Sequence, residues 1–226
     1  MRTPFAFSLS MLLCSALALP AQAAGTSATG SAQSTCDWTK IVLPDDRAAV
    51  EATVAGAIAR IPSATAMPGY HGDDLKEASL GGIVQAHALL QRARRPLPLG
   101  DIAGAWQVRS LQAGGDSVYD YPFFRARIAR TGCGFDFAKT TGSQRRTGRL
   151  LPMQDPRALA FLGTGTVNDD PTGPYGPANV PRGEPMGGDP QTPVNSAGRL
   201  LRIGRNELLM LLDFDERGFE LYHLKR

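Results

Sequence analysis

The chain has 226 residues, a formal net charge of only +3 and 42% hydrophobic residues. This hydrophobic content excludes a chain that is disordered throughout, and the length fits one domain with its own core. The small net charge gives no general indication of nucleic acid binding, so we predict no nucleic acid partner.

Residues 1–23 have the pattern of a secretory signal peptide. Arg2 precedes an apolar run over residues 5–19, and Ala21-Gln22-Ala23 matches an A-x-A cleavage site. Pro20 and the small residues after it end the run short of the roughly 20 residues that span a bilayer. We therefore predict cleavage after Ala23, export to the periplasm and no transmembrane segment in the mature chain; the alternative is an uncleaved membrane anchor.

Two cysteines, Cys36 and Cys133, remain after this cleavage. Two cysteines in an oxidising compartment predict one disulfide between them. Their spacing leaves open the alternative of two unpaired thiols, because pairing depends on the distance between them in the fold.

The first part of the mature chain is predicted to be helical. Residues 24–35 are mainly Gly, Ser, Thr, Ala and Gln, a composition typical of a flexible tether. Within the helical segment 36–99, apolar residues recur at three- and four-residue spacing over residues 45–60 and again over residues 73–93. Each stretch predicts one helix, and Gly81-Gly82 weakens the middle of the second.

Beyond Leu99 the apolar residues recur at every second position, which indicates strands. Short connections between successive strands favour antiparallel pairing, so residues 100–226 are predicted to form an antiparallel β domain. One connection, 166–197, is long and dense in Pro, Gly, Asn and Asp, and such loops are usually functional or disordered. The predicted strands are 104–112, 118–130, 134–140, 145–151, 157–165, 198–203, 206–214 and 218–225.

Alternation along the first two strands separates an apolar face from a polar one. The side chains predicted to point inward are Trp106, Val108, Phe124, Ala126 and Ile128. The fold class that follows is α+β, with two N-terminal helices and then an eight-strand antiparallel β-barrel or a strongly curved sheet.

The opening Gly104-Ala105-Trp106 resembles the start of the calycin barrels, the group of the lipocalins and avidins. In many of these barrels a basic residue of the last strand lies over the tryptophan. The resemblance implies that role for Lys225 or Arg226. An open sheet with helices on one face remains the alternative.

Three blocks, at 104–109, 121–128 and 139–148, carry a second resemblance, and the Thr-Gly-Ser-Gln-Arg sequence at 141–145 is its most specific part. They resemble domain-of-unknown-function family 4893, a group of exported proteobacterial proteins. The resemblance implies export and an α+β or β fold, and it implies no activity, substrate or cofactor. The family commonly has cysteines at the positions of Val108 and Ala126, which implies that these residues lie close together on adjacent strands.

The turn around Gly142 is the first candidate ligand site. Hydroxyl, amide and guanidinium groups surround a turn whose backbone N–H groups can point at a carboxylate or phosphate. The predicted ligand-binding residues of this turn are Thr141, Ser143, Gln144, Arg145 and Arg146. The alternative is a hairpin turn in which Ser143 and Gln144 bond to the local backbone.

Arg109, Arg125 and Arg127 are predicted to share the outward face of neighbouring strands and to extend the ligand site as a cationic patch. Outside the cytoplasm, such a patch would meet anionic lipid headgroups, lipopolysaccharide or acidic polymers. The alternative is a solvated sheet face.

No metal site or cofactor is predicted. Asn168-Asp169-Asp170, with Glu184 and Asp189, offers oxygen ligands, but the spacing matches no EF-hand loop. His71, His87 and His223 are scattered and form no zinc-binding motif.

The function that these features favour is a non-enzymatic envelope module that binds an anionic or amphipathic small molecule or a partner protein. One alternative is a periplasmic hydrolase that uses Ser143 or Asp169, since catalytic triads assemble from distant positions. The other is a purely structural docking module. The oligomeric state is not predicted.

Overall fold

The computed structural model describes residues 36–61, 73–184 and 192–226, and the side chains of residues 73–79 are not among the described parts. The predicted signal peptide, its cleavage site and the tether lie outside these residues, as do His71 and Asp189. Among the helices of the described residues, none is both long and apolar enough to cross a membrane.

The helical segment contains more elements than predicted. Instead of one helix over residues 45–60, the chain forms a short 3-10 turn and two helices, because it turns extended at Ala52. The Thr53 hydroxyl then accepts a hydrogen bond from the Gly56 backbone N–H (3.0 Å) and caps a new helix. The helical elements are η1 (Trp38–Lys40), η2 (Pro44–Asp46), α2 (Arg47–Glu51), α3 (Val54–Arg60) and α4 (Asp73–Ala93).

Helix α4 has the predicted bounds, and Gly82 explains how it packs. A Cβ atom at Gly82 would lie within 2.0 Å of the carbonyl oxygen of Val118. The glycine therefore lets the helix approach the backbone of the neighbouring strand, a contact that any side chain at this position would block.

The part of the chain that the structure describes then forms nine strands, one more than predicted. The predicted strand 118–130 is interrupted at Tyr121-Pro122-Phe123, because Pro122 has no N–H for a strand ladder. The long connection is also shorter than predicted, since the strands on both sides extend into it. The strands are β1 (Gly104–Gly114), β2 (Ser117–Asp120), β3 (Phe124–Thr131), β4 (Gly134–Lys139), β5 (Gln144–Pro152), β6 (Ala158–Val167), β7 (Val194–Gly204), β8 (Glu207–Leu212) and β9 (Gly218–Lys225).

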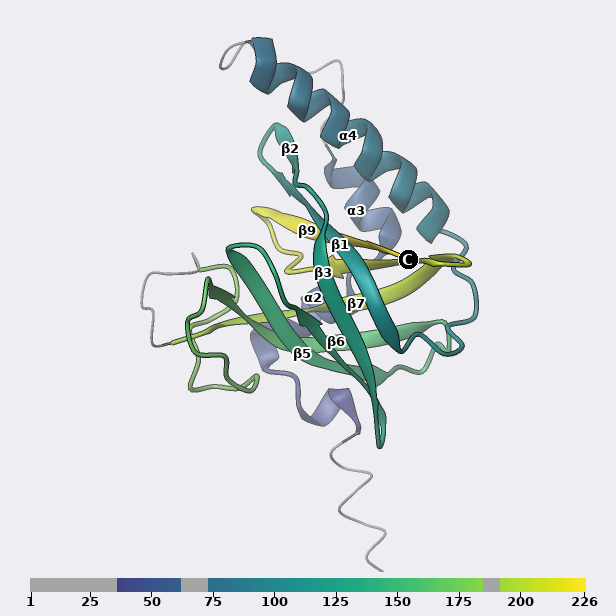
Figure 1. Ribbon diagram of the computed structural model, residues 1–226, viewed down its shortest axis with the longest axis vertical. Helices are drawn as coiled ribbons and strands as arrows, with labels where there is room; N and C mark the ends of the chain where they lie inside the picture. The colour runs from purple at the N-terminus through teal and green to yellow at the C-terminus, as the bar shows by residue number, and fades with distance from the viewer. Residues whose placement is uncertain (1–35, 62–72, 185–191) are drawn as a thin grey trace, which may run out of the picture.

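The strands close into a barrel (Figure 1). From β3 to β9 each strand pairs antiparallel with the next, and β1 pairs with both β3 and β9. Eight strands thus form the closed barrel, while β2 pairs only with the last part of β1. The predicted α+β fold with an eight-strand antiparallel barrel is confirmed.

The barrel interior is apolar over most of its length. Trp106, Val108, Ala126 and Ile128 are buried there, and Phe124 packs against them, so the predicted inward face is confirmed. Val108 and Ala126 point inward from the paired strands β1 and β3.

Arg226 covers the edge of this interior. Its guanidinium carbon lies 4.3 Å from the centre of the Trp106 ring, and it also donates to the carbonyl oxygen of Ala103 (3.0 Å). Of the two basic residues considered for this position, Arg226 therefore occupies it.

Two further apolar clusters fix the helical elements to the outside of the barrel. One joins α3 and α4 to the outer faces of β1, β2, β8 and β9, and the other places η1 and α2 on β5, β6 and β7. A disulfide between Cys36 and Cys133, with Cα atoms 5.6 Å apart, connects the chain two residues before η1 to the turn between β3 and β4. The predicted pairing of these cysteines is present in the structure.

Candidate functional site

One end of the barrel interior is polar. Along β1 the inward side chains are first apolar (Trp106, Val108) and then polar (Ser110, Gln112). Along β5, which runs the other way, they are first polar (Gln144, Arg146) and then apolar (Leu150). We call the end that contains Gln112, Gln144 and Arg146 the mouth. Alternation thus gives the barrel an apolar core at one end and a polar layer at the other.

Arg146 is the centre of this layer. Its side chain is 5% exposed, and its guanidinium pairs with Glu220 (Nη1 to Oε2, 2.6 Å) and Asp213 (Nη2 to Oδ2, 2.9 Å). The guanidinium carbon also lies 5.0 Å from the centre of the Tyr222 ring. Burial alone would lower the pKa of Arg146, but the Glu220 carboxylate, with Tyr222 and Asp213, raises it above the usual value, so the side chain stays charged.

Asp213 is held by its backbone as well as by its partners. Its φ of +52° lies in the left-handed region, which Asp tolerates better than most residues. Its carboxylate accepts hydrogen bonds from the backbone N–H of Ala197 (3.0 Å) and the hydroxyl of Ser196 (3.0 Å). Burial raises the pKa of the Asp213 carboxyl, and Arg146 offsets only part of that effect.

The buried charges of the layer balance. Glu220 accepts a hydrogen bond from the hydroxyl of Ser110, and Lys139 donates to the carbonyl oxygen of Gln144. Burial lowers the pKa of the Lys139 amine, which also lies 4.7 Å from the centre of the Phe124 ring. The buried cations Arg146 and Lys139 therefore lie beside the buried carboxylate of Glu220 and the half-buried carboxylate of Asp213, and Arg146 is not a free positive charge.

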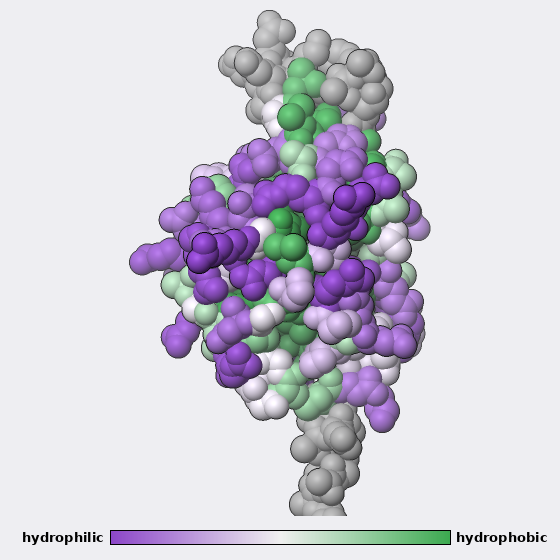
Figure 2. Space-filling model, turned by 90° about the vertical axis from the view of Figure 1, so that its right-hand side faces the viewer, coloured by the Kyte–Doolittle hydropathy of each residue, from purple (hydrophilic) through white to green (hydrophobic). Residues whose placement is uncertain are grey.

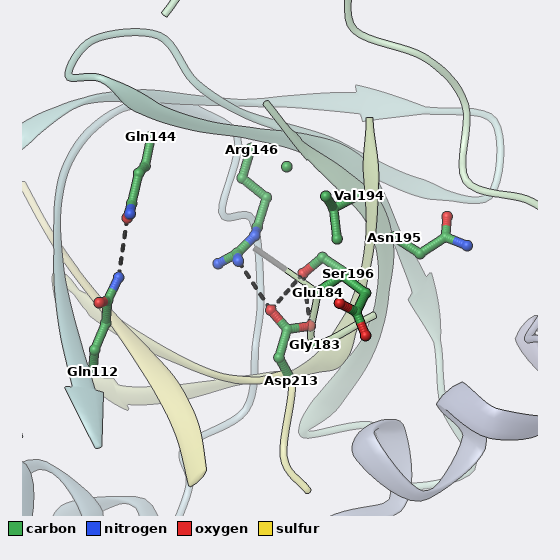
Figure 3. Close-up of a pocket in the computed structure, with 10 residues that line it drawn as sticks. Gln112, Gln144, Arg146, Gly183, Glu184, Val194, Asn195, Ser196 and Asp213 are labelled. Atoms are coloured by element: carbon green, nitrogen blue, oxygen red, sulfur yellow. Dashed lines mark hydrogen bonds and ion pairs between the residues drawn. The ribbon is translucent and has the colours of Figure 1, made fainter. Parts of the chain in front are cut away.

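A cavity of about 320 Å³ opens above this layer (Figure 3). Gln112 donates from its amide to Gln144 (3.0 Å) on one side, and the Arg146–Asp213–Ser196 chain lies on the other. Nε of Arg146 is buried and has no hydrogen-bond partner among the described residues. Nε of Arg109 and Arg199 and Nδ1 of His223 are buried without a partner among the described residues as well, so the site is defined by the lining of the cavity and not by this one atom.

The connection between β6 and β7 forms part of the cavity wall. Gly183 and Glu184 line the cavity, and the residues before them are anchored to the barrel. Asn195 on β7 holds this segment by hydrogen bonds to the backbone N–H and carbonyl of Gly176. Arg182 pairs with the buried carboxylate of Asp46 (3.0 Å), so the described part of this connection is fixed against η2.

The structure separates the residues predicted to share the Gly142 turn. Gln144 and Arg146 point into the barrel, whereas Arg145 points outward and pairs with Asp169 (3.0 Å). Thr141 accepts a hydrogen bond from the backbone N–H of Arg125 (2.8 Å). Ser143 is exposed, and its backbone carbonyl accepts from Asn168 (2.6 Å). The two arginines thus lie on opposite faces of β5.

The three arginines of the predicted patch lie on the outer face of β1 and β3, outside the cavity. Arg109 pairs with Asp120 (2.8 Å) and lies over the Phe123 ring. Arg125 and Arg127 are exposed, and neither has an ion pair with a described residue.

Two residues considered for hydrolysis or metal binding, Ser143 and His223, lie apart from the cavity lining. The Ser143 side chain has no hydrogen bond to a described residue. His223 points to the outer face of β9, where Nε2 lies 3.2 Å from Glu207, and burial lowers its pKa. Among the described residues, no three His, Cys, Asp or Glu side chains are grouped as metal ligands.

Sequence reasoning missed most of the polar layer. Ser110 and Gln112 continue the inward alternation that begins at Trp106, and extending that pattern would have found them. Glu220 points into the barrel from β9, as Tyr222 and Leu224 do. A single carboxylate among the inward apolar residues of this strand could have indicated a buried polar group. Nothing local distinguishes Asp213 or Ser196.

No curated protein and no solved structure shows significant similarity to the chain, so the comparisons supply no activity or ligand. The model of one family, DUF4893, described as a domain of unknown function, matches residues 38–214, from η1 to the end of β8 and just beyond. Because this match spans most of the helical segment and most of the barrel, the chain belongs to the DUF4893 family.

Proposed function

We propose that this chain is a non-enzymatic binding module that holds a small polar or amphipathic molecule in the mouth of its barrel. The observation that carries the proposal is a cavity of about 320 Å³ at the polar end of the barrel, lined by the amides of Gln112 and Gln144 and by the Arg146–Asp213 ion pair. Cavities of this size fit small ligands, and a few fixed polar groups set the orientation of what they hold. The disulfide is typical of an extracytoplasmic protein, which supports the proposed periplasmic location.

The charged groups that line the cavity favour a ligand whose polar head group is uncharged. Arg146 is the one cation among its described lining residues and is already paired, while Glu184 and Asp213 add carboxylates. An anion would therefore meet unfavourable charge. The amides of Gln112 and Gln144 offer both donors and acceptors, which suits a ligand rich in hydroxyl or amide groups.

The rim of the mouth supports an amphipathic ligand. Tyr119 lies opposite Gln112 in the β1–β2 pair, so both point to the same face. The hydroxyl of Tyr121 donates to Gln112 (3.3 Å). These tyrosines are 50% and 39% exposed, and their rings offer apolar surface beside a polar cavity.

Calorimetric titration with octyl glucoside, below its micelle concentration, and with octanoate tests this proposal. The two probes share an alkyl chain and differ in head group, and we expect the uncharged glucoside to bind more tightly. Gln144→Leu should weaken its binding about tenfold, the effect of losing one or two hydrogen bonds. The matched control is Gln107→Leu, which removes an exposed glutamine of the outer face and should leave affinity unchanged. Tighter binding of octanoate, or no saturable binding of the glucoside, would contradict the proposal.

A further inference from the structure

The end of the barrel opposite the mouth carries an excess of positive charge. Here the turn between β7 and β8, the segment after α4 and the last residues of β9 come together. Six exposed basic residues at this end and on the adjacent strands have no ion pair with any described residue. We call them the basic surface: Arg94, Arg95, Arg125, Arg127, Arg205 and Lys225.

Hydrogen bonds and strand pairing make this surface continuous. Leu97 donates its backbone N–H to the carbonyl of Arg202 (2.9 Å), which joins the segment after α4 to the β7–β8 hairpin. Arg226 donates to the carbonyl of Asn206 in the same hairpin (3.2 Å). Gln107 pairs with Lys225 on one side and Arg125 on the other, so these two cations flank one β1 residue.

Two carboxylates near this end are already paired with arginines outside the basic surface. Asp101 is paired with Arg130 (3.0 Å), and Glu207 is paired with Arg92 (2.6 Å). Along β3, the neighbours of Arg127 in the register are Ala105 and Ala138, which are small and uncharged. The six cations thus face solvent and have no carboxylate partner among the described residues.

Apolar surface lies among these cations. Leu97 is 44% exposed and follows Arg94 and Arg95 by only a few residues. Figure 2, which looks at the right-hand side of Figure 1, shows hydrophilic side chains around a small apolar patch on this face. Two hollows, of about 520 Å³ beside Arg94 and Arg95 and about 550 Å³ beside Arg125 and Lys225, lie at this end of the barrel.

We propose that the basic surface docks the barrel on an anionic lipid membrane. Anionic headgroups attract clustered Lys and Arg side chains near a membrane surface, and an exposed apolar side chain among them enters the headgroup region. The exposed Leu97 favours a lipid surface over a soluble polyanion, which would contact the cations alone. In this orientation the mouth, at the opposite end of the barrel, faces away from the membrane and stays open to solvent.

Co-sedimentation with lipid vesicles tests the proposal. The full chain should bind vesicles made of equal parts phosphatidylglycerol and phosphatidylcholine, should not bind pure phosphatidylcholine vesicles, and should bind less as ionic strength rises. The variant Arg94→Gln/Arg95→Gln/Arg205→Gln should lose at least about tenfold in partition coefficient. Leu97→Ser should weaken binding without changing its salt dependence.

The matched control removes three exposed charges elsewhere: Lys40→Gln/Arg47→Gln/Arg217→Gln. It changes net charge equally and should bind within about twofold of the unmodified chain. Equal losses in both variants would overturn the proposal, as would equal binding to both kinds of vesicle. Full competition by soluble polyphosphate, together with an unchanged Leu97→Ser variant, would overturn it in favour of an acidic polymer.

Discussion

Replacing Arg146 by methionine is expected to destabilise the chain by about 3–5 kcal/mol, measured as the free energy of unfolding in urea. Methionine fills much of the space of the arginine stem but leaves the buried Glu220 and the half-buried Asp213 without their cation. The cost arises from these two uncompensated carboxylates rather than from lost packing. A loss below about 1 kcal/mol would contradict the buried position of this guanidinium.

The neighbouring arginine provides the control for this experiment. Arg145 pairs with Asp169, whose side chain is 90% exposed, so Arg145→Met should cost less than about 1 kcal/mol. A second comparison isolates the cause. Adding Asp213→Asn and Glu220→Gln to Arg146→Met removes both unpaired charges and should recover a large part of the lost stability.

Removing the disulfide with Cys36→Ala/Cys133→Ala is expected to lower the free energy of unfolding by about 2–5 kcal/mol. The two cysteines are 97 residues apart in the sequence, so the bond constrains a long stretch of the unfolded chain. It also holds the chain next to η1, where Trp38 and Val42 pack on the barrel.

A reducing agent gives the control for the cysteine variant. It should lower the stability of the unmodified chain to that of the variant and leave the variant itself unchanged. Titration of two free thiols from Cys36 and Cys133 in the unreduced, denatured chain would contradict this account.

The apolar positions predicted the barrel well because its inner and outer faces differ in composition. Trp106 and Val108 alternate with polar residues, and this pattern gave the correct face of β1. The breaks in the elements depend on single groups that periodicity does not record. The hydroxyl of Thr53 caps a new helix, and Pro122 interrupts a strand.

The candidate site was harder to predict, and β5 shows why. Arg145 and Arg146 are adjacent, so one must point inward and one outward, but the strand pattern does not decide which. The rest of β5 does not distinguish its two faces either, because Gly148 has no side chain and Leu150 and Leu151 are both apolar. Leu150 lies in the barrel, and Leu151 packs outside it under η1 and α2.

The partners of Arg146 are even less accessible to sequence reasoning. Asp213 and Glu220 are 67 and 74 residues away along the chain, and only closure of the barrel brings them together. Arg146, which was expected in a ligand site at the turn, thus lies in an ion-pair cluster below a polar cavity.

The claim that the mouth of the barrel is a binding site is tested most directly by the NMR signal of the Arg146 Nε–Hε group. Arg146 lines the cavity, so a molecule bound there should change the chemical shift of this group. On titration with octyl glucoside, we predict a saturable shift of this signal that is weaker in Gln144→Leu. A silent Arg146 signal, with shifts confined to the outer faces of the strands, would show that the ligand binds elsewhere.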